Sequence, residues 1–231
     1  MLIDVIIPAF NEEGSIGSVI KDIPSAIVRD IVVVDNNSFD STSEIATAAG
    51  ALVLSESTQG YGAACLRGLN YLKTKDVLPD VVVFLDADYS DYPEQMAELV
   101  LPIKNNDVDM VLGSRTKGSM SKNAMPVQQR FGNWLATNMI QLFFGYKFTD
   151  LGPFRAIKFN KLLELNMQDK TYGWTVEMQL KALRSKLKII EIPVDYRQRI
   201  GESKISGTLK GTVLAGYKII TTIFRYLYLK K

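Results

Sequence analysis

The sequence predicts an α/β protein with a mostly parallel central sheet flanked by helices. Predominantly apolar runs at 2–7, 30–35 and 81–88 have the length and the continuity of strands buried on both faces. Amphipathic segments of helical length separate these runs, and such alternation is typical of a doubly wound sheet. With 231 residues and a hydrophobic fraction of 47%, the chain is long enough to bury one substantial core.

The first half of the chain alternates strands with helices in a regular order. Its predicted elements are a strand at 2–7, a helix capped by Asn11 and ended by Pro24, a strand at 30–35, a helix at 42–49, a strand at 51–54 and a helix opened by Gly60. Carboxylates end two of the strands, at Asp35 and at the pair Asp86 and Asp88. Because ligands bind outside the carboxyl ends of such strands, we expect these acids to lie along one functional edge.

The second half continues the pattern and adds a polar loop. Its predicted elements are a helix from Tyr92 to Leu101, a strand at 109–112, a polar loop at 116–128, a helix at 129–144, an irregular turn from Thr149 to Arg155, a helix at 172–184 and a strand at 187–194. The apolar face predicted for the 129–144 helix consists of Phe131, Leu135, Met139, Leu142 and Phe143. Residues 1–207 are interpreted as one domain, since no linker or internal repeat interrupts them.

Residues 208–231 are predicted to form a separate C-terminal helix that is basic and amphipathic. Its apolar side chains cover more than one stripe, lysines and an arginine interrupt and flank them, and no acid occurs between Leu209 and Leu229. This pattern suits a helix lying on a membrane surface. It suits equally a helix packed on the domain or on a second subunit. No apolar stretch reaches the roughly 18–20 residues of a spanning helix.

Composition excludes several classes of function. A net charge of +2 without a basic tail argues against a nucleic-acid partner. The absence of histidine excludes Ser-His triads and His-ligated zinc, so acid–base or metal chemistry falls to carboxylates. One cysteine, Cys65, excludes an internal disulfide framework. With no secretory signal at the N-terminus, we expect a cytoplasmic protein, either soluble or peripheral on the inner face of the membrane.

The pair Asp86 and Asp88 marks the candidate functional site. A turn after the apolar run lets both carboxylates approach one cation, and Mg²⁺ or Mn²⁺ prefers carboxylate oxygens together with substrate phosphates. An Asp-x-Asp pair by itself is more often an acidic, solvated turn. Because Asp35 is expected along the same edge of the sheet, a metal site is favoured over a solvated acidic turn.

Seven short motifs occur in an order that is specific as a set. They are Ile7-Pro8-Ala9-Phe10-Asn11-Glu12, Val33 to Ser38, Gly60-Tyr61-Gly62-Ala63, Asp86-Ala87-Asp88, Gly113-Ser114-Arg115, Asp150 to Arg155, and Arg199 to Lys204. The set resembles glycosyltransferase family 2, inverting enzymes of the Rossmann-like GT-A fold, over essentially the whole chain. Within that family it is most similar to the dolichyl- and polyprenyl-phosphate sugar synthases, such as dolichyl-phosphate mannosyltransferases.

The resemblance implies a role for each group of residues. The nucleotide-sugar pocket would contain Pro8, Phe10, Glu12, Asp35, Asp86 and Ala87. Asp86 and Asp88 would hold the Mg²⁺ or Mn²⁺ ion that bridges the diphosphate. The acceptor phosphate would meet Arg115, Arg130, Ser203 and Lys204. The residues implied as catalytic are Asp88, Arg115, Arg199 and Glu177. Any single arginine is more often a surface ion-pair partner, whereas Phe10 could equally be a core residue.

The chain departs from the family at Ser90-Asp91, where relatives often carry Gln-His. Asp91 is interpreted either as a third oxygen ligand of the metal or as the N-cap of the following helix, and the cap is favoured. A second departure concerns Glu177, which stands between Val176 and Met178, whereas many relatives that act on sugars carry Glu-Asp near this position.

The missing base motif favours an acceptor that is already anionic. A phosphate attacks the anomeric carbon without proton removal, whereas a sugar hydroxyl needs a carboxylate base. The expected reaction is therefore inverting transfer of a hexose from GDP-mannose or UDP-glucose to a polyprenyl or dolichyl phosphate. One alternative is transfer to a glycan or metabolite hydroxyl with Glu177 or Asp150 as base. Another is a nucleotide-sugar-binding protein without turnover. The oligomeric state is left open.

Overall fold

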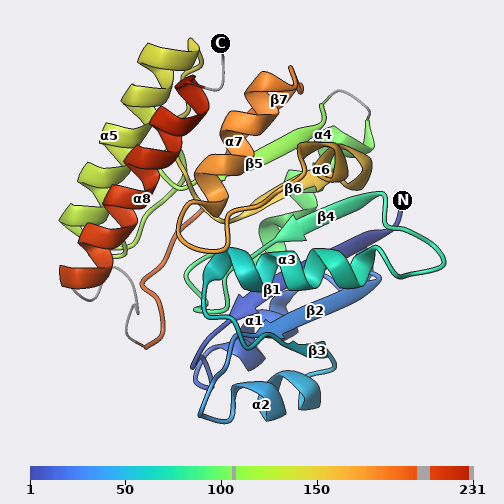
Figure 1. The fold of residues 1–231 in the computed structure, drawn as a ribbon. Helices are drawn as coiled ribbons and strands as arrows, with labels where there is room; N and C mark the ends of the chain where they lie inside the picture. Colours follow the sequence, from blue (N-terminus) through green and yellow to red (C-terminus); the bar gives the residue numbers. More distant parts are fainter. Residues whose placement is uncertain (106–107, 202–208, 229–231) are drawn as a thin grey trace.

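The computed structural model describes residues 1–105, 108–201 and 209–228, which form a sheet between two layers of helices (Figure 1). Within these residues the sheet has seven strands in the order β3-β2-β1-β4-β6-β5-β7. The strands are β1 (Ile3–Ala9), β2 (Asp30–Asp35), β3 (Leu52–Ser55), β4 (Val81–Phe84), β5 (Met110–Ser114), β6 (Arg155–Lys158) and β7 (Ile189–Pro193). The α/β prediction is confirmed.

Helices alternate with the strands along most of the chain. They are α1 (Ile16–Asp22), α2 (Thr42–Ala48), α3 (Tyr61–Leu72), α4 (Met96–Lys104) preceded by the 3₁₀ turn η1 (Pro93–Gln95), α5 (Val127–Phe144), α6 (Phe159–Leu165), α7 (Trp174–Arg184) and α8 (Leu209–Tyr228). In the described residues no helix combines the length and the apolarity needed to cross a membrane.

Strand direction brings the predicted acids to one edge of the sheet. β1 pairs in parallel with β2 and with β4, whereas β6 runs antiparallel between β4 and β5. The carboxyl ends of β1, β2 and β4 therefore face the same side of the sheet. The segments that follow them carry Pro8 to Glu12, Asp35 with Asn36, and Asp86 to Asp88.

Side chains of successive strand residues enter two separate cores, as the period of two requires. Val82 and Phe84 pack in the core on the side of α3, α5, α7 and α8. Val81 and Val83 pack in the core on the side of α1 and α4. Because β4 is buried on both faces, its sequence is continuously apolar rather than alternating.

Two local predictions are wrong. The first helix begins at Ile16 instead of directly after Asn11, whose positive φ of 53° places it in a left-handed turn. In α5 the predicted apolar face points partly outward, since Phe131 and Leu142 are 60% and 77% exposed. The buried face of α5 is formed by small, polar and branched side chains, namely Asn133, Ala136, Thr137 and Ile140. These pack closely on the protein, while Phe131 and Leu142 are left outside and Met139 and Phe143 are partly buried at the edge of the core.

The C-terminal helix packs on the domain. Ile223 and Tyr226 of α8 are buried in the same core as Trp174 of α7. The rings of Phe224 in α8 and Phe143 in α5 meet at 5.7 Å between centroids. One face of α8 thus completes the core, and its other face carries exposed apolar side chains such as Val213 and Tyr217.

Candidate active site

A cavity of about 450 Å³ opens at the edge of the sheet where β1 and β4 end. Its lining residues are Pro8, Ala9, Phe10, Glu12, Asn36, Gln59, Gly60, Tyr61, Ala64, Asp86, Ala87, Asp88, Thr171, Tyr172 and Arg199. Five of the six residues predicted for the nucleotide-sugar pocket are in this set. The sixth, Asp35, lies beside it, where one of its carboxylate oxygens accepts a hydrogen bond from the Ser38 backbone N–H at 3.1 Å.

Asp88 is held firmly in the turn that follows β4. Its Oδ1 accepts hydrogen bonds from the Ser90 hydroxyl at 2.6 Å and from the Ser90 backbone N–H at 2.9 Å. Its Oδ2 forms an ion pair with Arg199 at 3.1 Å. Ser90 therefore orients the carboxylate of Asp88.

Asp86 has the chemistry of a cation ligand. Its side chain is buried, and its Oδ1 has no hydrogen-bond partner. Burial and the nearby negative charge of Asp88 raise the pKa of Asp86 to about 7. A divalent cation between Asp86 and Asp88 would supply the missing partner and offset the repulsion, so the two residues fit a Mg²⁺ or Mn²⁺ ion.

Arg199 crosses the cavity and connects two of its walls. Its guanidinium forms ion pairs with Glu12 at 2.6 Å and with Asp88 at 3.1 Å. Glu12 belongs to the segment after β1, whereas Asp88 follows β4. A cationic side chain thus stands next to the carboxylates that fit a metal, where phosphate oxygens of a ligand would find a bidentate donor.

Close contact between two backbones forms another wall of the cavity. At Gly60 and Gly62 an added Cβ would collide with the carbonyl oxygens of Lys170 and Asp169, so only glycine fits at either position. The Ala63 N–H donates a hydrogen bond to the Lys170 carbonyl at 2.9 Å. The Gly60-Tyr61-Gly62 motif therefore presses the start of α3 against the 169–172 segment, which carries the cavity residues Thr171 and Tyr172.

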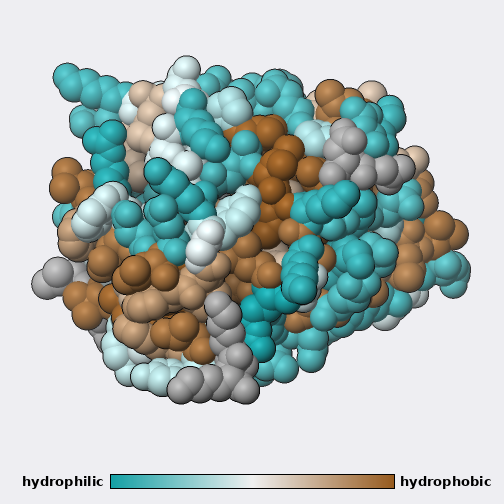
Figure 2. Space-filling view, turned by 90° about the horizontal axis from the view of Figure 1, so that it is seen from above, coloured by the Kyte–Doolittle hydropathy of each residue, from teal (hydrophilic) through white to brown (hydrophobic). Residues whose placement is uncertain are grey.

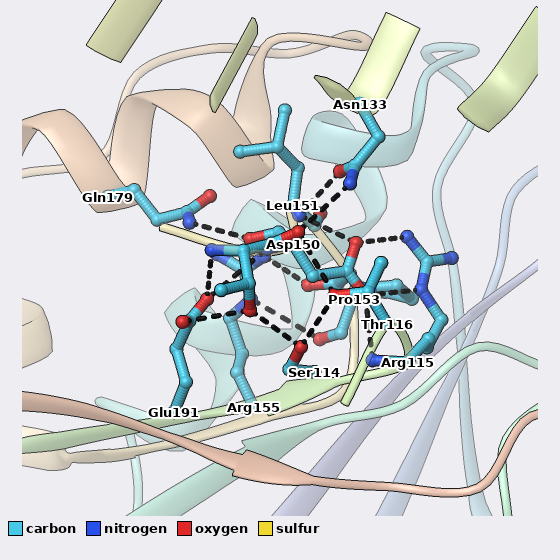
Figure 3. A network of polar contacts seen from close by, with 12 residues as sticks. Ser114, Arg115, Thr116, Asn133, Asp150, Leu151, Pro153, Arg155, Gln179 and Glu191 are labelled. Atoms are coloured by element: carbon cyan, nitrogen blue, oxygen red, sulfur yellow. Dashed lines mark hydrogen bonds and ion pairs between the residues drawn. The ribbon is translucent and has the colours of Figure 1, made fainter. Parts of the chain in front are cut away.

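Arg115, predicted to contact phosphate, is already paired within the protein (Figure 3). Its Nε and Nη2 each donate a hydrogen bond of 2.7 Å to Asp150, which binds the guanidinium as a fork. The guanidinium also lies 4.9 Å from the ring centre of Tyr196. Neither Arg115 nor Asp150 lines the cavity.

The irregular turn that carries Asp150 is held by a dense set of hydrogen bonds (Figure 3). Glu191 accepts from the Thr149 and Asp150 backbone N–H groups at 2.8 and 3.2 Å. Asn133 of α5 accepts from the Leu151 N–H at 2.9 Å, and Gln179 of α7 donates to the Asp150 carbonyl at 3.1 Å. The turn therefore links α5, α7 and β7, and it fixes the carboxylate that holds Arg115.

Glu177, predicted to be catalytic, lies buried in α7 outside the cavity lining. Its carboxylate accepts hydrogen bonds from the backbone N–H groups of Gln168 and Asp169 at 3.2 and 2.7 Å. The Tyr226 hydroxyl of α8 donates a further bond at 3.0 Å, and Lys181 forms an ion pair at 2.7 Å. These contacts hold the chain that leads into the 169–172 wall.

Asp91 is not a helix cap, so that preferred interpretation is wrong. The residue at the N-cap position of η1 is Tyr92, and neither carboxylate oxygen of Asp91 has a hydrogen-bond partner. Burial and the charge of Asp86 raise the pKa of Asp91 well above its usual value. Among the described residues no group of three carboxylates has the arrangement of a metal site.

Of the remaining residues predicted for the acceptor phosphate, the structure describes Arg130, and it does not line the cavity. Arg130 is exposed on the first turn of α5. Ser203 and Lys204 lie outside the described residues. Sequence reasoning also missed several lining residues. Asn36 follows the second acidic strand end and could have been identified there, whereas Thr171 and Tyr172 follow no strand or motif that marks them.

Residues 4–165 match the family Glycosyl transferase family 2. An uncharacterized glycosyltransferase of Mycobacterium tuberculosis is 31% identical, over 92% of this chain and 94% of its own length. A dolichyl-phosphate hexose transferase of Haloferax volcanii is 31% identical over 91% and 89%. An undecaprenyl-phosphate mannosyltransferase of Micrococcus luteus is 29% identical over 91% and 90%.

Among solved structures, glucosyl-3-phosphoglycerate synthase of Mycobacterium tuberculosis, in complex with Mn²⁺, UDP and glucosyl-3-phosphoglycerate, matches with a TM-score of 0.74. The match covers 98% of this chain and 80% of that one at 22% identity, and it shows the likeness of fold. The sheet thus has the GT-A arrangement that the sequence predicted. With both the family match and relatives of 31% identity spanning most of its length, the chain belongs to glycosyltransferase family 2.

Proposed function

We propose that the protein transfers a hexose from a nucleoside diphosphate sugar to a polyprenyl or dolichyl phosphate, with inversion at the anomeric carbon. The observation that carries this proposal is that each carboxylate lining the cavity already has a cationic partner or fits the metal ion. Within the described residues, the acids lining the cavity are Glu12, Asp86 and Asp88. Arg199 pairs with the first and the last, and Asp86 fits the metal, so an acceptor that needs no base suits the site.

The relatives support the same class of acceptor. The names of the Haloferax and Micrococcus enzymes describe transfer to dolichyl phosphate and undecaprenyl phosphate. A phosphate is already ionised near neutral pH and is a competent nucleophile there. The two base candidates of the hydroxyl alternative, Asp150 and Glu177, are bound to Arg115 and to Lys181, away from the cavity lining.

Each part of the cavity has a task in this reaction. Asp86 and Asp88 would hold the Mg²⁺ or Mn²⁺ ion, which supplies positive charge near the departing diphosphate. Arg199 would donate hydrogen bonds to phosphate oxygens, and Phe10 would pack against the nucleotide. The acceptor oxygen forms its bond to the anomeric carbon while the bond from that carbon to the diphosphate breaks.

The test is a donor screen with lipid acceptors. Purified protein is incubated with labelled GDP-mannose or UDP-glucose, Mg²⁺ or Mn²⁺, and undecaprenyl or dolichyl phosphate, and label is extracted into chloroform. We expect one donor to give lipid-linked hexose, and Asp88→Ala to abolish it while melting cooperatively. Asp76→Ala, which changes an exposed acid outside the cavity, serves as the control. Product on a soluble hydroxyl acceptor with none on either lipid would refute the proposal.

A further inference from the structure

Exposed apolar side chains are concentrated on two neighbouring helices. In the described part of the chain, 17 large hydrophobic side chains are exposed, and nine of them belong to α5 or α8. They are Val127, Phe131, Trp134 and Leu142 of α5, and Val213, Leu214, Tyr217, Phe224 and Tyr228 of α8. Figure 1 shows the two helices side by side at one end of the sheet. Figure 2 shows brown side chains gathered on that same side of the molecule.

Helical spacing aligns these side chains into one surface. Val127, Phe131 and Trp134 follow the i, i+4, i+7 pattern of a single helix face. Val213 and Tyr217 do the same on α8. The contact between the rings of Phe143 and Phe224 joins the two helices. The nine residues together are called the α5–α8 face, and it lies opposite the sides of both helices that enter the core.

Positive charge is concentrated in two segments of the chain that contain these helices. Residues 115–149 and 203–231 contain 11 lysines and arginines and no aspartate or glutamate, although the whole chain has 27 basic and 25 acidic residues. The remaining residues therefore carry 16 basic and 25 acidic side chains. The overall charge of +2 conceals two acid-free segments that contribute α5 and α8 and a strongly acidic remainder.

We propose that the α5–α8 face docks on a lipid bilayer that carries anionic headgroups. Tryptophan, tyrosine and phenylalanine side chains on an apolar face suit the boundary between acyl chains and headgroups. Basic side chains in the same segments, such as exposed Arg130 and Arg225, are attracted to anionic lipid. A second copy of the chain suits the face less well, because a twofold contact would bring together the same basic segments, including exposed Arg130 and Arg225, and those segments hold no acid to pair with them.

The bilayer would then lie next to the helix that supports the active site. Lys218 of α8 forms an ion pair with Asp169 at 2.8 Å, at the start of the cavity wall that carries Thr171 and Tyr172. Tyr226 donates its hydrogen bond to Glu177 about two turns further along α8. A helix that rests on the membrane thus also holds one side of the donor cavity in place. Docking of this kind does not require the acceptor to be a lipid.

The test measures binding to vesicles that contain neither acceptor nor donor. The full-length protein is floated with vesicles of pure phosphatidylcholine or of phosphatidylcholine with 30% phosphatidylglycerol, at low and at high salt, about 20 and 500 mM. We expect binding to the anionic vesicles that falls at least about tenfold in high salt or without phosphatidylglycerol. The double variant Phe131→Glu with Trp134→Glu should lose at least about tenfold in binding, since it puts charge into the apolar layer.

A matched control separates the face from general effects of added charge. Leu101→Glu changes a side chain of α4 that is 55% exposed on the opposite side of the sheet, and it should bind vesicles like the unaltered protein. Thermal melting checks that all variants fold. Equal binding to both kinds of vesicle, or undiminished binding of the double variant, would overturn the inference. The inference would also be overturned if light scattering showed a dimer that is lost in the double variant but is not dissociated by vesicles. Failure of the lipid-acceptor proposal would leave these results unchanged.

Discussion

At the scale of single residues, Arg199 is the side chain on which the geometry of the cavity depends most. It neutralises Glu12 and Asp88 together, and removing it leaves two carboxylates facing each other across the site. We expect Arg199→Gln to lower kcat/KM by about 10²–10³-fold, as loss of one preorganised charge donor typically does. Steady-state kinetics with the active donor check this. Arg67→Gln is the control, because Arg67 reaches the Ser55 carbonyl away from the cavity.

Asp86 makes the stability of the metal-free protein depend on pH. Burial, with the charge of Asp88, raises the pKa of Asp86 from 3.8 to about 7, so the folded state binds this proton more tightly than the unfolded state. Stability from this group is therefore present below pH 4 and is lost as pH rises toward 7, by at most about 4 kcal/mol. Urea unfolding at pH 5 and pH 8 should show a smaller decrease for Asp86→Asn than for the unaltered protein.

Added Mg²⁺ or Mn²⁺ gives a second measure of the same carboxylate. The cation competes with the proton for Asp86, so it should raise the melting temperature more at pH 8 than at pH 5. Asp86→Asn should remove most of this gain. An equal gain at both pH values, or one that persists in the variant, would place the cation elsewhere.

At the scale of elements, α7 and α8 together position one wall of the cavity. Glu177 of α7 binds the backbone before that wall, and Tyr226 and Lys218 of α8 bind Glu177 and Asp169. We therefore propose that Glu177 positions this wall, in contrast to its predicted catalytic role. The short sequence around it gave no sign of this, because its partners come from two segments that are distant in sequence.

Glu177→Gln separates the two roles. The amide keeps the shape but removes the charge opposite Lys181, which is 14% exposed and keeps its hydrogen bond to the Asn166 carbonyl, so the loss should cost about 1–3 kcal/mol. We expect a clearly lower melting temperature, a raised KM for the donor, and a kcat within about tenfold of the unaltered enzyme at low temperature. A base would give the opposite pattern, with full stability, an unchanged KM and a kcat lowered by about 10²–10⁴-fold.

At the scale of the whole molecule, the α/β class and the strand ends that carry acids were predictable because burial on both faces leaves a continuous apolar signal, whereas the order of the strands was not predicted. Val81 to Phe84 and the acids after them are examples. Pairing between distant side chains was not predictable. Arg115 has the sequence context of a phosphate ligand, yet its guanidinium pairs with Asp150. The outward face of α5 has the apolar pattern of a core face, and only the packing of the helix shows that it is exposed. Periodicity identifies an apolar face without identifying its partner.

α8 has two such faces, and they should respond differently to mutation. Ile223 is fully buried against the core, so Ile223→Ala should destabilise the protein by about 2–5 kcal/mol. Tyr217 is 68% exposed, and Tyr217→Glu should change stability by less than about 0.5 kcal/mol. Denaturant unfolding measures both values.

The same two variants test whether docking on the bilayer contributes to the rate of hexose transfer. If the α5–α8 face holds the enzyme on its acceptor membrane, Tyr217→Glu should transfer hexose normally to acceptor dispersed in detergent and several-fold more slowly to acceptor embedded in anionic vesicles. The reason is that docking raises the local concentration of acceptor without touching the reacting groups. Ile223→Ala should instead lose activity in both assays as it unfolds. Equal losses for Tyr217→Glu in detergent and in vesicles would show that this face contributes to the cavity itself and not to docking.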